Sequence, residues 1–222
     1  MMDISALLAV EKGVTALIGG GGKTTLMYTL AEELRRRGTV IVTTSTHIQR
    51  PEQYPVLTAA DDVAAALAEH GAVCVAGETA EGKLCAPALS FEVLAALADF
   101  VLVEADGSRR LPLKAHAPHE PVIPANTRRT VYVVGADGFG HPIRQVCHRP
   151  ERYAALCGAA EDDIVTPMLE AAVLHAEGYA DGWVFINKVE TAEDWRSAEA
   201  LAALLPGKVL AGSLRERVYR GL

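Results

Sequence analysis

The 222-residue chain lacks several features that mark special classes of protein. It has no apolar run near the ~18–20 residues that cross a bilayer, so we expect no membrane partner. The N-terminal segment MMDISALLAVEKG has neither the basic start nor the apolar length of a secretion signal. Its four cysteines form no C-x-x-C pair. Together these absences predict a reduced, cytoplasmic protein.

An excess of basic charge is also missing, because the formal net charge is −7. This argues against a nucleic-acid partner. A 50% share of hydrophobic residues excludes general disorder, and we expect one domain over residues 1–222. The charge is uneven: residues 105–152 hold eight Lys/Arg against four acids, so they carry +4 and the remainder −11. Six of the eleven prolines lie there too, which predicts a basic, Pro-rich functional loop region.

Strand and helix patterns alternate along the chain. Val14–Ile18 and Thr39–Thr43 read as buried strands, and from Leu26 apolar residues recur with helical spacing. Asp61 is expected to cap an Ala-rich helix that ends near His70. Such alternation predicts an α/β fold, with a mostly parallel sheet flanked by helices and ligands beyond the C-terminal strand ends.

Two segments have a less regular pattern. Residues 77–88, with the sequence GETAEGKLCAPA, fit either a hairpin or a loop. Residues 105–129 show no strong periodicity, and we expect a long surface loop there. Loops of that length in compact domains usually serve a function.

Glycines, a lysine and two threonines separate the first strand pattern from the first helical one. They are Gly19, Gly20, Gly21, Gly22, Lys23, Thr24 and Thr25. Glycines let a backbone approach an anion, and a helix N-terminus supplies free N–H groups. In this arrangement Lys23 reaches the β- and γ-phosphates and Thr24 coordinates Mg²⁺. The pattern predicts a P-loop nucleoside triphosphatase type of fold.

The loop is shorter than the usual G-x-x-x-x-G-K-[ST], which would need glycine where Leu17 stands. It matches G-x-x-G-K-T from Gly19 onward. Short loops of this kind occur in ATP-dependent ligases of the Mur type, so ATP remains open beside GTP as the nucleotide.

Two acids follow a buried-strand pattern at Phe100–Val103. Glu104 stands where nucleotide enzymes place a carboxylate for Mg²⁺, and Asp106 can complete the metal shell or orient a water. Which acid touches the metal is left open. Thr44, after the second strand pattern, is a further candidate for Mg²⁺ or the γ-phosphate, although turn chemistry explains it equally well.

Asn187, Lys188 and Glu190 follow a late strand pattern, WVFI. The guanine-binding motif of GTPases is N-K-x-D at the same kind of place, where the acid accepts two hydrogen bonds from the base. Glu190 is one methylene longer and can still accept both. The turn Ala211–Ser213 can supply a backbone donor to the guanine oxygen. These residues favour GTP narrowly over ATP.

Several segments together resemble one family. They are GGGGKTTLM, VIVTTSTHI, VLVEADGSRRLPLKAHAPHEPVIP, VVGADGFG, CHRPE and FINKVE. The chain is similar from about Val14 to Glu190 to the YqeC-like family, described as selenium-dependent hydroxylase accessory proteins. That resemblance implies a P-loop fold and a role in maturing molybdenum-containing hydroxylases, through their cofactor or its sulfur or selenium ligand. Two residues depart from the family pattern: His116 stands where Pro is frequent, and Glu190 where Asp is.

The basic loop region suggests a second ligand. Arg109 and Lys114, with Arg110, follow Asp106 and would lie near the γ-phosphate. They can bind an anionic second substrate, such as a phosphorylated pterin, or neutralise charge in phosphoryl transfer. A solvated loop paired with the chain's acids is the alternative. A zinc site can also be drawn from His116, His119, His141, Cys147 and His148. Their spacing matches no known ligand pattern, and we do not favour it.

Three functions therefore remain. The first is a Mg²⁺-dependent GTPase or ATPase that helps to mature a molybdenum or selenium hydroxylase, with the apo-hydroxylase as partner. The second is an ATP-dependent ligase or kinase for a small anionic molecule. The third is a nucleotide-gated chaperone whose main work is binding a partner protein.

Overall fold

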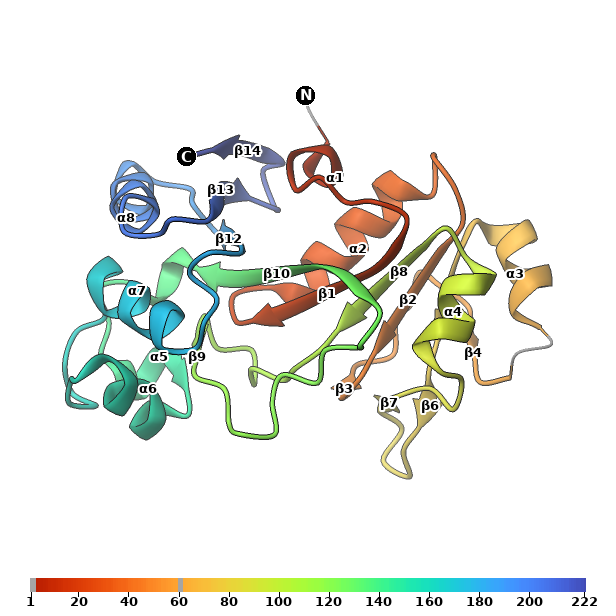
Figure 1. The fold of residues 1–222 in the computed structure, drawn as a ribbon, viewed down its shortest axis with the longest axis horizontal. Coiled ribbons are helices and arrows are strands. Elements are labelled where there is room, and N and C mark those ends of the chain that lie inside the picture. Colours follow the sequence, from red (N-terminus) through yellow and green to blue (C-terminus); the bar gives the residue numbers. More distant parts are fainter. Residues whose placement is uncertain (1–2, 60–61) are drawn as a thin grey trace.

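The computed structural model describes residues 3–59 and 62–222 and is built around a nine-stranded sheet (Figure 1). From edge to edge its strands are β14 (Val218–Gly221), β13 (Lys208–Ser213), β12 (Trp183–Asn187), β10 (Thr127–Gly135), β1 (Gly13–Gly19), β8 (Phe100–Glu104), β2 (Val40–Thr44), β5 (Ala72–Val75) and β4 (Val56–Leu57). Neighbours pair in parallel except β13 and β14. The predicted fold class is confirmed, and the first strand lies between β8 and β10.

Helices cover both faces of this sheet. They are α1 (Ile4–Leu7), α2 (Lys23–Leu34), α3 (Val63–His70), α4 (Phe91–Leu97), α5 (Ile143–Val146), α6 (Pro150–Cys157), α7 (Pro167–Ala176) and α8 (Ala192–Ala202), with a 3-10 turn η1 (Ala136–Gly138). Leu17 packs with residues of α1 and α2, whereas its neighbours Ala16 and Ile18 pack with residues of α4, α7 and α8. The strand is thus buried on both faces, which explains its continuous apolar run.

Two smaller sheets complete the fold. The segment 77–88, which fitted either a hairpin or a loop, contains the antiparallel pair β6 (Gly77–Glu78) and β7 (Leu84–Cys85), and β7 also pairs with β3 (His47–Ile48). The second sheet joins β9 (Leu113–Lys114) to β11 (Cys147–His148) in parallel. Asp61, the expected helix cap, lies outside the described residues, and α3 begins at Val63.

The expectation of a surface loop over 105–129 is wrong for its middle part. Pro112–His116 are buried. Leu113 and Ala115 join the core, and the Pro112 carbonyl accepts a hydrogen bond from the Gly135 N–H. Pairing with β11 satisfies the backbone here, so a segment without helical or strand periodicity can still be interior.

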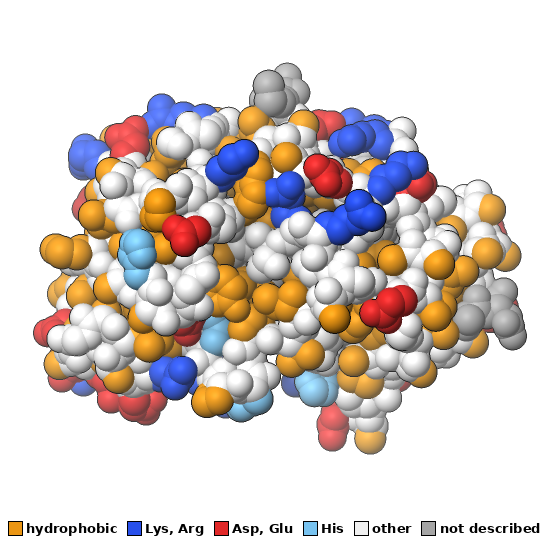
Figure 2. All heavy atoms as spheres, viewed as in Figure 1, with side chains coloured by type: hydrophobic (Ala, Val, Ile, Leu, Met, Phe, Trp, Pro, Cys, Tyr) orange, Lys and Arg blue, Asp and Glu red, His pale blue; other side chains and the backbone are white. Residues whose placement is uncertain are grey.

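Charges of both signs are interspersed on the face drawn in Figure 2, along the edge near α1 and α2. Arg35 and Arg36, which follow α2 directly, pair with Glu32 and Asp3. Across residues 3–59 and 62–222, none of the helices combines the length and apolar character that a bilayer crossing requires.

Candidate functional site

The glycine loop joins β1 to α2 at the C-terminal edge of the sheet. Gly19, Gly21 and Gly22 have φ values of +94°, +68° and +119°, which side chains rarely adopt. A Cβ on Gly21 would also meet the Gly135 nitrogen at 2.2 Å. The loop is therefore a glycine-dependent turn that opens onto the N-terminus of a 12-residue helix. Such an end offers free N–H groups and a positive dipole to an anion.

Lys23 begins α2 and folds back over the loop. Its Nζ donates to the Gly19 carbonyl oxygen at 2.6 Å and lies 2.9 Å from Asp106 Oδ1. Its side chain is almost completely buried, so its charge is held by the loop and by the acid. The lysine predicted to contact phosphate is thus positioned inside the loop.

Thr24 and Glu104 form an oxygen-lined corner beside that lysine. The Thr24 hydroxyl donates to Glu104 Oε2 at 2.6 Å. Burial raises the pKa of Glu104, while Lys23 and the Thr24 hydroxyl lower it. The Thr44 hydroxyl donates to the Glu104 main-chain carbonyl at 2.8 Å, so Thr44 braces the end of β8. Thr25 lies one residue further along α2.

Asp106 contacts the glycine loop directly. Its Oδ2 accepts a hydrogen bond from the Gly19 N–H at 2.7 Å, and its side chain is fully buried. Burial acts to raise the pKa of Asp106, but Lys23, His116 and Lys114 outweigh it and hold the pKa well below the usual value. The acid is therefore a carboxylate that locks the loop and the lysine together.

His116 connects this acid to a distant helix end. Its Nε2 lies 2.6 Å from Asp106 Oδ2, and its Nδ1 lies 2.6 Å from Glu177 Oε2. The His116 main-chain N–H also donates to Glu177 Oε1 at 2.6 Å. Burial lowers the pKa of His116, yet the two carboxylates raise it above its ordinary value overall. Glu177 is the residue after α7. No motif surrounds it, so the sequence alone does not identify it as a site residue.

Lys114 lies on the other side of the same acid. Its Nζ is 3.4 Å from Asp106 Oδ2 and 2.7 Å from Glu120 Oε2. Glu120 in turn pairs with Arg149 at 2.6 Å. Lys114 is fully buried, so its charge is matched by these acids inside the protein. Its pKa is lowered by burial, and Asp106 and Glu120 oppose that effect.

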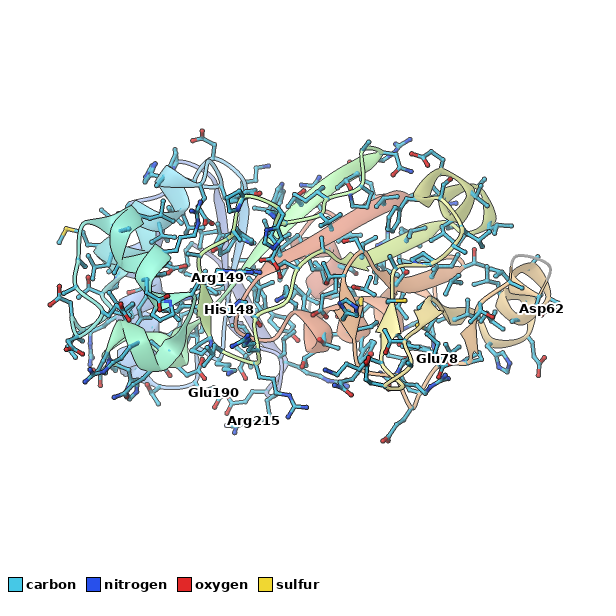
Figure 3. All side chains as sticks on the ribbon, turned by 90° about the horizontal axis from the view of Figure 1, so that it is seen from below. Asp62, Glu78, His148, Arg149, Glu190 and Arg215 are labelled. Atoms are coloured by element: carbon cyan, nitrogen blue, oxygen red, sulfur yellow. The ribbon has the colours of Figure 1, made fainter. Side chains whose placement is uncertain are left out.

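The rest of the basic segment is divided between interior and surface. Arg109 and Arg110 are exposed, with positive φ values of 51° and 64°. Two successive non-glycine residues in this conformation cost roughly 1–2 kcal/mol each. His148 and Arg149 lie side by side in Figure 3, at the start of α6. The structure therefore brings Lys114 and Arg149 into the acid network and leaves Arg109 and Arg110 on the surface.

Asn187 ties the strand end β12 to the glycine loop. Its Nδ2 donates to the Gly21 carbonyl at 2.7 Å, and its Oδ1 accepts from the Leu214 N–H at 3.1 Å. Because the amide is buried and both of its ends are bonded, it fixes the loop relative to the turn after β13.

Glu190 lies next to that turn. Its Oε1 accepts from the Ser213 hydroxyl at 2.9 Å, and its Oε2 lies 2.5 Å from Arg215 (Figure 3). Lys188, with φ +63°, reaches Asp137 at 2.6 Å. The three predicted base-recognition residues thus lie at one strand end, with an acid whose orientation is set by a hydroxyl and an arginine.

Within the described part of the chain, no group of three or more His, Cys, Asp or Glu side chains is arranged to hold a metal ion. Two residues of the zinc alternative have other surroundings. His116 is bound by two carboxylates, and burial raises the pKa of the Cys147 thiol. The oxygen donors of Thr24 and Glu104 suit Mg²⁺ rather than zinc.

A strand, a glycine loop closed by a lysine, a helix and a Thr–Glu pair at the end of the neighbouring strand β8 define a P-loop fold. The sequence profile described as YqeC protein matches residues 15–151. YqeC of Escherichia coli (strain K12) is 34% identical over 196 residues, covering 80% of this chain and 76% of that protein. The chain belongs to the YqeC family.

The Signal Recognition Particle 54 kDa protein of Aeropyrum pernix K1, in complex with GDP, aligns with a TM-score of 0.41 at 16% identity. The alignment covers 96% of this chain and 44% of that one, so the chain spans less than half of its length.

Proposed function

We propose that this protein binds a nucleoside triphosphate with Mg²⁺, GTP in preference to ATP, and hydrolyses it. The observation that carries this proposal is Lys23, held inside a glycine loop next to the Thr24–Glu104 pair. A phosphate placed on the N–H groups of α2 would meet the lysine ammonium, which can turn from Asp106 to the anion.

Thr24 and Glu104 would hold the Mg²⁺ ion, since a hydroxyl and a carboxylate already in contact are hard oxygen donors. When bound, the ion neutralises phosphate charge and orients the β- and γ-phosphates. Asp106 would act through the loop, because its oxygens contact the Gly19 N–H and Lys23.

The preference for GTP rests on Glu190. A carboxylate accepts both N–H donors of the guanine edge, and the same edge of adenine lacks that donor pair. Ser213 and Arg215 hold the Glu190 side chain at the strand end that Asn187 connects to the phosphate loop. The phosphate loop and Glu190 would thereby bind the phosphates and the base at a fixed separation.

We also propose a role in maturing a molybdenum or selenium hydroxylase, with the apo-enzyme as partner, because the motifs between Val14 and Glu190 resemble a family described by that role. An anionic second substrate, such as a phosphorylated pterin, would meet the exposed Arg109 and Arg110, because Lys114 is matched by buried acids. A ligase or kinase activity would use the same groups, and phosphate transfer to a small acid without a protein partner would favour it.

The test is calorimetry with GTP, ATP and their diphosphates, with and without Mg²⁺. Lys23→Ala should lose roughly thirtyfold in affinity, the ~2 kcal/mol of a charge-assisted hydrogen bond. Lys83→Ala, an exposed lysine between β6 and β7, is the control and should bind like the wild type. Equal affinity of Lys23→Ala and the wild type would refute the phosphate-loop interpretation.

Two further variants separate the metal from the base. Thr24→Ala should weaken binding with Mg²⁺ and leave Mg²⁺-free binding nearly unchanged. Glu190→Gln should weaken GTP by about tenfold and leave ATP unchanged, because an amide accepts at one atom only. Glu193→Gln, exposed on α8, is its control. Binding of ATP without GTP would remove the guanine assignment.

A further inference from the structure

An unbroken series of buried contacts runs from the phosphate loop to the end of α7. The Gly19 N–H and His116 Nε2 both meet Asp106 Oδ2, at 2.7 Å and 2.6 Å. Glu177 then holds His116 twice, through the ring Nδ1 and the main-chain N–H, each at 2.6 Å. Every side chain in this series is at most 6% exposed.

Stability alone does not explain such an arrangement. Buried ionic groups gain little over apolar residues of the same size, because their desolvation costs about as much as their pairing returns. Here Asp106 and Glu177 are both taken from water to flank one imidazole. A functional role explains the arrangement better, and the series of contacts reaches Lys23 through Asp106.

Other groups facing His116 leave it little freedom. The rings of Tyr132 on β10 and Tyr179 after α7 pack on the imidazole, each with its centroid 5.7 Å away. Lys114 contacts the same Asp106 oxygen from β9. The neighbouring rings block sideways displacement of the imidazole, so His116 holds Asp106 and Glu177 in a fixed relation.

We propose that His116 and Glu177 are positioning residues that hold Asp106 against the phosphate-loop lysine. The inference rests on the proposed nucleotide binding. In the structure Lys23 is shared between Gly19 and Asp106. When phosphates take over part of its bonding, Asp106 keeps the Gly19 N–H and His116, so the loop stays formed while the lysine is released.

The test is a double-mutant cycle on Mg²⁺–GDP and Mg²⁺–ADP affinity, measured by calorimetry. Glu177→Gln presents one amide N–H₂ where a second acceptor is needed, so it should weaken binding by about fivefold in the wild type. In the Lys23→Ala background the same change should have a much smaller effect, because the lysine is gone and only the contact of Asp106 with the Gly19 N–H remains. Glu177→Asp keeps a carboxylate and should be intermediate.

The matched control is Glu151→Gln, the same chemical change on exposed surface of α6. It should leave affinity unchanged in both backgrounds. Thermal unfolding of each variant identifies any that do not fold. If Glu177→Gln binds like Glu151→Gln, or costs as much with Lys23→Ala as without it, the positioning role is overturned.

A second readout needs no nucleotide. The ring ¹⁵N resonances of His116 should move in nucleotide-free Lys23→Ala and stay in place in Lys83→Ala. Unmoved His116 signals in Lys23→Ala would overturn the proposal whatever the binding data show. If no nucleotide binds the wild type, the proposed function fails, and this spectrum still decides whether the lysine and His116 are coupled.

Discussion

Two acids only two residues apart have opposite electrostatic environments. Burial dominates at Glu104 and raises its pKa, while at Asp106 the surrounding cations prevail and lower it. The difference arises because Asp106 faces Lys23, Lys114 and His116 together. Glu104 is thereby suited to share the Thr24 hydroxyl proton, and Asp106 to remain a fixed anion under the loop.

A third acid, Glu170 on α7, gives a pH prediction. Burial and the nearby Glu177 raise the pKa of Glu170 to about 7, although Tyr153 donates to it at 2.7 Å. The unfolded value is near 4.3. The native state therefore holds this proton more tightly, and stability falls as pH rises from about 4.3 to about 7.

Glu170→Gln keeps an oxygen for Tyr153 and has no proton to lose. Its stability relative to the wild type should therefore rise by about 3 kcal/mol across that pH window and stay level above it. Urea unfolding at pH 5 and pH 8 measures the difference. Glu92→Gln, exposed on α4, should show no such pH dependence. If the stability difference between Glu170→Gln and the wild type did not change with pH, the raised pKa of Glu170 would be contradicted.

Sequence patterns could identify the residues that follow strands. Glu104 and Asp106 follow one apolar run within three residues, and Lys23 follows the glycines after another. Because parallel strands end at one edge of the sheet, the proximity of these residues was predictable. Glu177 was not, because it reaches His116 from 61 positions away and lies after an ordinary helix end. A lone glutamate there carries no local signal of the buried imidazole it contacts.

At the scale of elements, the glycine loop is held by residues 111–112, whose sequence pattern does not reveal this contact. The Leu111 carbonyl accepts from the Gly21 N–H at 3.2 Å, and Pro112 covers Gly20. The many prolines and the lack of periodicity predicted a surface loop here. A two-residue strand such as β9 is too short to show a periodic pattern, and its partner β11 lies far along the chain. The segment is interior because the glycines leave room for it.

That close fit predicts the outcome of a minimal substitution. A Cβ on Gly20 would meet the Pro112 carbonyl oxygen at 2.4 Å, so Gly20→Ala forces the backbone apart. We expect a loss of about 1–3 kcal/mol in stability and weaker nucleotide binding. Gly107→Ala is the control, because nothing lies within 4 Å of its added Cβ. Denaturant unfolding compares the two variants. Equal stabilities would show that the Pro112 backbone moves aside at no cost.

For the whole molecule, net charge is a poor guide to the surface. The +4 of residues 105–152 predicted a basic loop region, yet Lys114 and Arg149 within it are paired with Glu120. Composition counts charges without their partners, so it predicted the presence of a basic segment and not its partial burial.

Ligand linkage gives a test on the entire protein. A nucleotide at a hundredfold excess over its Kd stabilises the folded state by about 2.7 kcal/mol. For a protein of this size that raises Tm by roughly 5–10 °C. Differential scanning fluorimetry should show the shift with GTP and Mg²⁺, less with ATP, and little with Lys23→Ala. The absence of a shift with any nucleotide would count against binding.

The central position of β1 also bears on how the protein is made. Its partners β8 and β10 are separated from it by most of the first half of the chain, and Asn187, which bonds to Gly21, follows far later. Contacts so distant in sequence delay folding. During synthesis the glycine loop would therefore leave the ribosome long before it can take shape, and a partner or chaperone acting on the nascent chain would meet it unformed.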